Sequence, residues 1–237
     1  MTLRVFCFVA LAAIVGCSED LASGSGAADR DVSTDAVAEQ AARVTQLNRT
    51  VKGLGGSFSR MRQRVNLSGT DVSDADLQSI DWVPKHVRSL NLSGTNITND
   101  GLSYIKPESG IEKLNLNGTR ITDDGLKRLA GLEGLEDLSI ARTSITDAGL
   151  NNLGLLPGLE SLDVSGTQIT NAGLDAILGL PGLVILDLSN TNLTGEALVM
   201  LKQNTALMSL TLPFESFTEE QIEELREAIP TTTVHLN

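Results

Sequence analysis

The sequence has little positive charge, few aromatic side chains and almost no cysteine. Of its 237 residues, 18 are Lys or Arg and 30 are Asp or Glu, which gives a formal net charge of −12. Nucleic acids and anionic membrane surfaces bind proteins through basic patches, so the acidic net charge disfavours both as partners of the whole chain. We therefore expect no nucleic-acid partner.

Long apolar runs and catalytic motifs are also missing. The apolar run from Val5 to Val15 is shorter than the roughly 18 residues that a membrane-spanning helix needs. The sequence contains no HExxH motif, phosphate-binding loop or GxSxG elbow, and its two histidines, His86 and His235, belong to distant repeats. The aspartate-rich stretches 71–76 and 121–125 lack the full spacing of a calcium loop. We expect a non-catalytic protein without metal or cofactor.

The first residues have the pattern of a targeting segment. The run Val5 to Val15 has the length of a signal-peptide core, and it ends at Ile14-Val15-Gly16-Cys17. This ending resembles the lipobox of bacterial lipoproteins, in which a small residue precedes a cysteine that becomes lipidated. The resemblance implies a signal peptide over 1–16 and a lipidated Cys17; the alternative is a general secretory signal with an incidental cysteine.

The composition after Cys17 is that of a tether. Residues 17–34 are rich in Ser, Gly, Ala and Asp, which favours a flexible linker between the anchor and a folded domain. Ser18, rather than an aspartate, follows the cysteine, and in lipoproteins this favours the outer membrane. We expect an exported protein of the bacterial cell envelope that faces the periplasm or the cell exterior and touches the membrane only through this lipid.

A motif of five residues recurs through the rest of the chain. NLSGT stands at 66–70 and 91–95, and NLNGT, DVSGT and DLSNT follow at 115–119, 163–167 and 187–191. The apolar residue of each unit recurs at a spacing of 25 and then 24 residues, at Leu67, Leu92, Leu116, Ile140, Val164, Leu188, Leu212 and Leu236. One such unit cannot bury a core alone, so the period predicts a stack of repeats.

Each unit contains a strand pattern followed by a helix pattern. Apolar residues alternate around Asn115 and are then three apart at Leu126 and Leu129. The spacing L-x-x-L-x-L, as at Leu135, Leu138 and Ile140, resembles leucine-rich repeats. The resemblance implies an α/β right-handed solenoid over 65–237, with eight strands and about seven repeats. Parallel strands, about 4.8 Å apart, should line its concave face, and short helices, which need about 8–10 Å, should line the convex face.

Two columns of hydroxyl residues accompany the repeat. We expect the first column to bond the backbone of the neighbouring repeat and the second to cap helices, with the acid or amide after each cap favouring the helix dipole. The first column is Thr70, Thr95, Thr119, Thr143, Thr167 and Thr191, and the second is Ser73, Thr98, Thr122, Thr146, Thr170, Thr194 and Thr218.

Residues 35–64 differ from the repeats. Apolar residues at helical spacing predict a helix over 35–54 that ends at Gly55-Gly56, and a strand-like SFSR follows at 57–60. We expect this segment to cap the first repeat; the alternative is a helical interaction segment.

The resemblance implies that the protein, as a monomer, binds another protein or a cell-surface macromolecule through its concave surface. The alternatives are a substrate adaptor like those of F-box type, for which residues 18–64 are too short and polar, and a purely structural envelope protein. Arg142, where other repeats have Gly, and Phe214 break the regularity. The candidate surface comprises Arg142, Asp163, Asp187, Thr211, Pro213, Phe214 and His235. The competing interpretations are a merely solvated face and a pair of phenylalanines, Phe214 and Phe217, that seals the last repeat.

Overall fold

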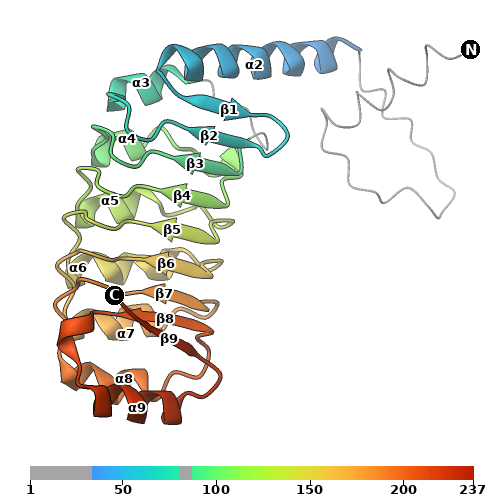
Figure 1. Ribbon diagram of the computed structural model, residues 1–237. Helices are drawn as coiled ribbons and strands as arrows, with labels where there is room; N and C mark the ends of the chain where they lie inside the picture. Colours follow the sequence, from blue (N-terminus) through green and yellow to red (C-terminus); the bar gives the residue numbers. More distant parts are fainter. Residues whose placement is uncertain (1–33, 81–86) are drawn as a thin grey trace, which may run out of the picture.

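The computed structural model describes residues 34–80 and 87–237, which form one stack of repeats (Figure 1). The predicted signal peptide 1–16, Cys17, the tether except for Thr34, and His86 lie outside the described residues. Within residues 34–80 and 87–237, no helix is both long and apolar enough to cross a membrane.

A single sheet runs along one side of the stack and follows the order of the chain from β1 to β9. The first pair of strands is antiparallel and every later pair is parallel. The eight strands predicted for the repeats are β2–β9, and the strand-like segment at 57–60 adds a ninth, β1. The strands are β1 Ser57–Ser59, β2 Arg64–Asn66, β3 Ser89–Asn91, β4 Lys113–Asn115, β5 Asp137–Ser139, β6 Ser161–Asp163, β7 Ile185–Asp187, β8 Ser209–Leu212 and β9 Thr233–Leu236.

Short helices line the opposite side of the stack, so the predicted α/β solenoid is confirmed (Figure 1). The α-helices are α2 Thr34–Gly53, α3 Asp74–Ser79, α4 Asn99–Leu102, α5 Asp123–Arg128, α6 Asp147–Leu150, α7 Leu174–Leu178, α8 Leu198–Leu201 and α9 Glu219–Ala228. The 3-10 helices are η1 Pro107–Ser109, η2 Asn151–Leu155, η3 Asn171–Gly173, η4 Gly195–Ala197 and η5 Phe214–Ser216.

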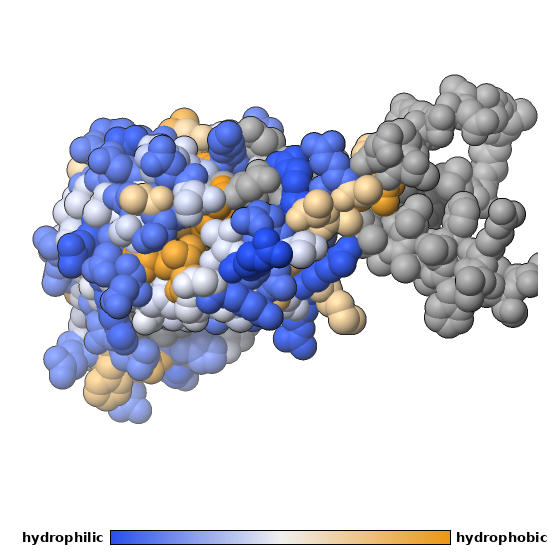
Figure 2. Space-filling model, turned by 90° about the horizontal axis from the view of Figure 1, so that it is seen from above, coloured by the Kyte–Doolittle hydropathy of each residue, from blue (hydrophilic) through white to orange (hydrophobic). Residues whose placement is uncertain are grey.

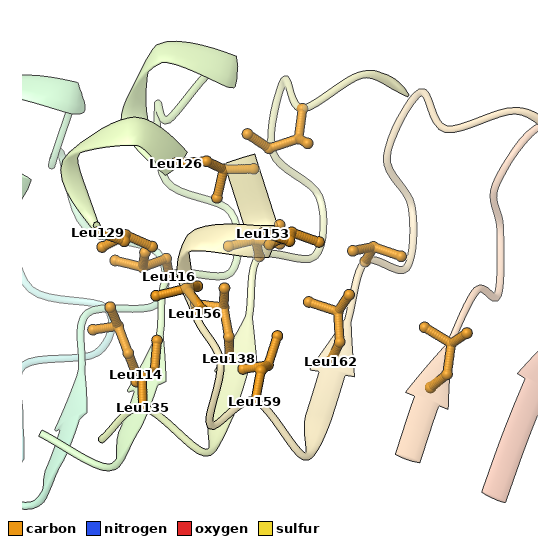
Figure 3. Close-up of a cluster of buried hydrophobic side chains, with 14 of the residues drawn as sticks. Leu114, Leu116, Leu126, Leu129, Leu135, Leu138, Leu153, Leu156, Leu159 and Leu162 are labelled. Carbon is orange, nitrogen blue, oxygen red and sulfur yellow. The ribbon is translucent and has the colours of Figure 1, made fainter. Parts of the chain in front are cut away.

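The core is a stack of leucines repeated from one unit to the next. Leu114, Leu138 and Leu162 pair in register across β4, β5 and β6, and each is at most 2% exposed. Figure 3 shows these side chains with Leu126 and Leu153 from the helix side, packed between the two layers. Full burial of such a side chain contributes about 2–3 kcal/mol, which only neighbouring repeats can supply. This mutual burial is why the 24-residue spacing is so regular.

The first threonine column bonds within its own repeat, which corrects the expectation of a bond to the neighbouring one. Each of the six hydroxyls donates to the carbonyl oxygen of the residue three positions earlier, at 2.5–2.7 Å; Thr143, for example, donates to Ile140. Five of the six threonines are buried. The threonine hydroxyl therefore gives this turn carbonyl a short hydrogen bond; at Leu67, Leu92 and Leu116 the carbonyl also accepts from the backbone N–H of the same threonine at 3.2–3.3 Å.

The repeats are joined instead by the acid or amide that follows each helix cap. Asp123 accepts from the backbone N–H of Thr146 at 2.8 Å and from its hydroxyl at 2.8 Å. The same pair of contacts recurs between Asp147 and Thr170. Backbone contacts of this kind, at 2.8–3.0 Å, form five successive rungs from one repeat to the next, which we call the ladder: Asp74–Thr98, Asn99–Thr122, Asp123–Thr146, Asp147–Thr170 and Asn171–Thr194.

The identity of the ladder residue decides whether the threonine also caps its helix. Where the rung is Asp, the threonine hydroxyl donates to it and keeps a lone pair that accepts from an N–H two residues on, as at Thr146 and Thr170. Where the rung is Asn99, its amide nitrogen donates to Thr122, which makes no side-chain cap bond. The predicted caps are thus confirmed at some positions and replaced by the ladder at others.

The ladder explains the glycine that recurs in four units, at Gly101, Gly125, Gly149 and Gly173. A Cβ on Gly149 would overlap the Asp123 carboxylate and would lie 3.1 Å from the Asp123 Cα atom. A Cβ on Gly125 would lie 2.6 Å from Asn99 Oδ1. In these four units the glycine therefore leaves room for the rung from the preceding repeat, whereas Ala197 takes this place beside the last rung, Asn171–Thr194.

The turn after each of the strands β2 to β7 contains one residue with a left-handed backbone. Gly94 and Gly118 have φ of 66° and 65° there, and Arg142 and Asn190 occupy the same place with φ of 55° and 54°. A side chain disfavours this conformation by roughly 1 kcal/mol, least for Asn. Arg142 is thus a strained substitution on the exposed rim of the turn.

Both ends of the stack are covered by helices. The predicted N-terminal helix spans Thr34–Gly53 and buries Val44, Leu47 and Val51 against the first strands. At the other end, α9 buries Ile222 and Leu225, and the capping box of Thr218 with Gln221 is present as predicted. Each helix shields the apolar edge that an end repeat would otherwise expose.

Candidate functional site

The outward residues of the sheet form aligned rows. In each strand the middle residue points into the core and its neighbours point outward, because side chains alternate along a strand. The third residues of strands β2 to β9 pair in register and form one row, the strand row: Asn66, Asn91, Asn115, Ser139, Asp163, Asp187, Thr211 and His235.

Most members of the strand row make the same turn. The side-chain oxygen of Asn91 or Asn115 accepts from the backbone N–H two residues later, and Asp163 and Asp187 do the same through one carboxylate oxygen. These bonds, and that of Asn66, are 2.9–3.1 Å long. Because a neutral amide oxygen makes the turn equally well, the charge of Asp163 and Asp187 is not needed for it.

The N-terminal half of this face is neutral to basic. A shallow depression of about 210 Å³ lies over β2–β5. Lys113 at its edge forms an ion pair with Asp137 at 3.2 Å, and Arg64 is exposed beside it. The carboxylate present in this half is therefore paired with a cation.

The C-terminal half is acidic and partly apolar. One oxygen of Asp163 accepts from the Ser139 hydroxyl at 2.6 Å, whereas the second oxygen of Asp187 has no hydrogen-bond partner among the described residues. Ile185, two residues before Asp187, is 47% exposed. Met208 donates its backbone N–H to Val184 at the same end of the strands and is 65% exposed. Acidic and apolar groups thus occupy neighbouring places on β7 and directly before β8.

Three segments of the sequence, 83–106, 111–130 and 158–178, match a family model described as Leucine Rich repeat. The fold is that of a leucine-rich-repeat protein. Among solved structures, an internalin from Listeria monocytogenes matches with a TM-score of 0.54 and 20% identity, over 74% of this chain and 55% of the internalin chain. The chain therefore spans about half the length of that internalin.

A second solved structure, the actin-binding site 2 of leiomodin-1, matches with a TM-score of 0.43 and 18% identity, over 67% of this chain and 86% of that chain. No curated protein sequence matches the chain.

The leucine-rich-repeat sheet brings together four of the predicted surface residues. Asp163, Asp187, Thr211 and His235 are neighbours in the strand row, and His235 is exposed. Thr211 is half-buried between its neighbours in the row. These four residues are therefore presented on one continuous surface.

The other three predicted residues lie elsewhere or are hidden. Arg142 is exposed on the rim of the turn after β5, where its backbone N–H donates to Ser165. Pro213 is buried, which removes it from the candidate surface. Phe214 is 67% exposed on η5 and lies beside α9 in a depression of about 450 Å³, whereas Phe217 packs against the core. Only Phe217 therefore matches the interpretation that the phenylalanines seal the last repeat.

Sequence reasoning missed Ile185 and Met208. Ile185 occupies the first strand position, where neighbouring repeats have Ser161 and Ser209. A comparison of that column alone would have singled out the isoleucine, since an apolar residue there faces outward. Within residues 34–80 and 87–237, no group of three or more His, Cys, Asp or Glu side chains could hold a metal ion.

Two exposed charges on the helix side pair with each other. A hydrogen bond from Lys127 to Asp124, 2.7 Å long, lowers the pKa of the Asp124 carboxyl and raises that of Lys127. This pair lies on α5, away from the strand row. It stabilises its helix as an i,i+3 pair and has no part in the candidate surface.

Proposed function

We propose that the protein is a lipid-anchored, extracytoplasmic leucine-rich-repeat protein that binds another protein and catalyses no reaction. The binding surface is the C-terminal half of the strand face: Asp163, Asp187, Thr211 and His235 with Ile185 and Met208. The anchor is Cys17, and the domain stands as a monomer on the bacterial envelope, in the outer membrane facing the periplasm or the cell exterior.

The observation that carries this proposal is the excess charge of Asp163 and Asp187. Asn66, Asn91 and Asn115 make the same turn without charge, so the two carboxylates exceed what the backbone requires. Charged groups in one place on a surface set partner choice and association rate more than they set stability.

The chemistry of this surface favours a basic partner segment with apolar side chains. Asp163 and Asp187 offer negative charge, and Ile185 and Met208 offer apolar area that water covers in the free protein. An apolar centre with charged groups at its rim is the usual arrangement of a protein interface. A methionine at such a surface also adapts to the shape of its partner.

Site-specific photocrosslinking tests the surface. A photoreactive residue at Met208 should yield adducts with a partner protein in cells. The same residue at Val199, which is 66% exposed on α8, is the matched control and should yield none. Equal adducts from both positions would refute the assignment of the surface.

The anchor needs a separate experiment. Metabolic labelling with an acyl probe should mark the wild-type chain and should leave the Cys17→Ser variant unlabelled. Equal labelling of both chains would refute lipidation at Cys17. The protein-binding surface is tested by the crosslinking experiment and does not depend on this result.

A further inference from the structure

Charge is separated along the stack of repeats. Residues 35–64 contain six Lys or Arg against two acidic residues, whereas residues 129–237 contain three against 15. The end covered by α2 is therefore basic although the whole chain is acidic. Figure 2 looks onto this end and shows mostly hydrophilic side chains with apolar residues between them.

The basic groups gather at the hairpin between β1 and β2. Arg60, Met61 and Arg62 lie on the connecting loop and Arg64 begins β2; we call these four residues the basic hairpin. All four are exposed, and Met61 is 98% exposed. None of the three arginines forms an ion pair with a carboxylate of residues 34–80 or 87–237.

The hairpin is held in place by the backbone beside it. The register of β1 and β2 pairs Ser59 with Arg64. Gln63, with a left-handed φ of 47°, presents its carbonyl oxygen to the backbone N–H groups of Arg88 and Ser89 at 2.7 and 3.1 Å. These contacts fix the loop to the next repeat, so the exposed side chains project from an ordered base.

We propose that the basic hairpin docks on an anionic lipid surface, which would add a second membrane contact to the lipid anchor expected from the sequence. Each guanidinium can pair with a lipid phosphate in a two-pronged geometry, and each arginine near such a surface adds roughly fivefold to the affinity. Met61, between two arginines, supplies an apolar side chain for the boundary between headgroups and acyl chains. No other described residue of its size and apolarity is as exposed.

The position of the hairpin favours a membrane over an acidic protein. The inference rests on the proposed anchor at Cys17. The tether predicted over 17–34 would span roughly 20–25 Å as a flexible chain, which keeps the domain close to the membrane. The helix α2 and the hairpin lie at the same end of the stack (Figure 1). Because α2 begins directly after the predicted tether in the sequence, a lipid on Cys17 would bring this end nearest to the membrane.

The acidic end does not cancel this attraction. Charges in physiological salt are screened over about 8–10 Å. The parallel strands from β2 to β9 extend over about 34 Å at about 4.8 Å per gap. With the hairpin on the surface, the acidic α9 and its neighbours lie beyond the screening distance, and the strand face stands clear of the membrane.

Vesicle binding tests the proposal with the full chain carrying Cys17→Ser, so that no acyl chain contributes. The probe is a vesicle of phosphatidylcholine alone or with phosphatidylglycerol. The unmodified hairpin should favour the anionic vesicles by about tenfold or more at low salt. The variant Arg60→Gln/Arg62→Gln/Arg64→Gln should lose this preference, and Met61→Ser should weaken binding severalfold while the preference remains.

The matched control removes the same number of charges elsewhere. Lys106→Gln/Arg120→Gln/Lys127→Gln should keep the preference, and circular dichroism should show all variants folded. Equal preference in the two triple variants, or none in the unmodified hairpin, would overturn the proposal. So would hairpin-dependent capture of an acidic protein without any vesicle preference. Because Cys17 is absent throughout, these outcomes are independent of whether the cysteine is lipidated.

Discussion

Two pairs of aspartates in adjacent repeats have different roles. Asp123 and Asp147 belong to the ladder, where both carboxylate oxygens accept from a threonine of the next repeat. Asp163 and Asp187 belong to the strand row, where one oxygen makes a turn that asparagine makes as well in other repeats. The residue type is the same, but the partners differ. The second oxygen of Asp163 accepts from the Ser139 hydroxyl at 2.6 Å, whereas the second oxygen of Asp187 has no hydrogen-bond partner among the described residues.

The two halves of the strand face also use different residue types for the same turn. The N-terminal half uses Asn91 and Asn115 for the turn and pairs its acid, Asp137, with Lys113. The C-terminal half uses aspartates for the turn and places Ile185 beside them. The turn bond is the same in both halves, so it does not by itself account for the aspartates of the C-terminal half.

The largest expected effect lies in the ladder. Gly149→Ala should lower the free energy of unfolding by about 3 kcal/mol or more, because the new Cβ overlaps Asp123 and breaks its two bonds to Thr146. Gly154→Ala is the control: a Cβ at Gly154 meets nothing within 4 Å, so its effect should stay within about 1 kcal/mol. Chemical denaturation of both variants measures the difference; equal effects would contradict the socket role of Gly149.

A smaller loss is expected when a rung is removed without a clash. Asp123→Ala should cost about 2 kcal/mol of stability, because the N–H and hydroxyl of Thr146 lose their acceptor. Asp123→Asn should cost less than about 1 kcal/mol, since Asn99 and Asn171 make this rung in the native sequence. Thermal unfolding compares the two variants, and the ladder would be in doubt if alanine and asparagine behaved alike.

The aspartates of the strand row should show the opposite behaviour. Asp163→Asn/Asp187→Asn should change stability by no more than about 1 kcal/mol, because both turn bonds are retained and only the bond from Ser139 to Asp163 loses a charged acceptor. Affinity for the crosslinked partner should fall about tenfold, with a weaker dependence on salt, because the charge is lost. Asp175→Asn, at an exposed position of α7, is the control for a change of net charge and should bind normally in the same titration.

The smallest effect concerns pH. Hydrogen bonds from the Ser73 backbone and hydroxyl lower the pKa of Asp76 below its ordinary value of 3.8. A lowered pKa adds stability above pH 3.8 that is lost as the pH falls through the folded value. Asp76→Asn should therefore be less stable than the wild type by a few tenths of a kcal/mol near neutral pH, since the site is mostly solvated. Below pH 3.8 the free energies of unfolding of the wild type and of Asp76→Asn should converge. A difference that stays constant with pH would contradict the carboxylate as the source of the added stability.

The architecture could be predicted because every repeat buries apolar side chains at the same positions against its neighbours. Leu135, Leu138 and Ile140 are fully buried as the L-x-x-L-x-L spacing predicts. The helix over 35–54 was also readable, since Val44, Leu47 and Val51 share one face. Such patterns depend on which residues point inward, and period alone determines that.

The sequence could not show which hydrogen-bond partner each polar residue would choose. The acid after each cap was expected to favour the helix dipole, yet Asp123 and Asp147 bond across to the next repeat. Pro213 and Phe214 are adjacent in the sequence, but one is buried and the other is exposed. Choices of this kind depend on distances between repeats, which a one-dimensional pattern does not contain.

The most direct test of the central claim compares two exposed apolar residues on opposite sides of the stack. Ile185→Asp and Val199→Asp introduce the same charge, on the strand face and on α8 respectively, and both side chains are already in contact with water. Recovery of the partner in a crosslinking pull-down is measured together with the melting temperature of each variant. We expect both variants to remain folded and only Ile185→Asp to lose the partner. Loss of the partner with Val199→Asp, or full recovery with Ile185→Asp, would contradict it.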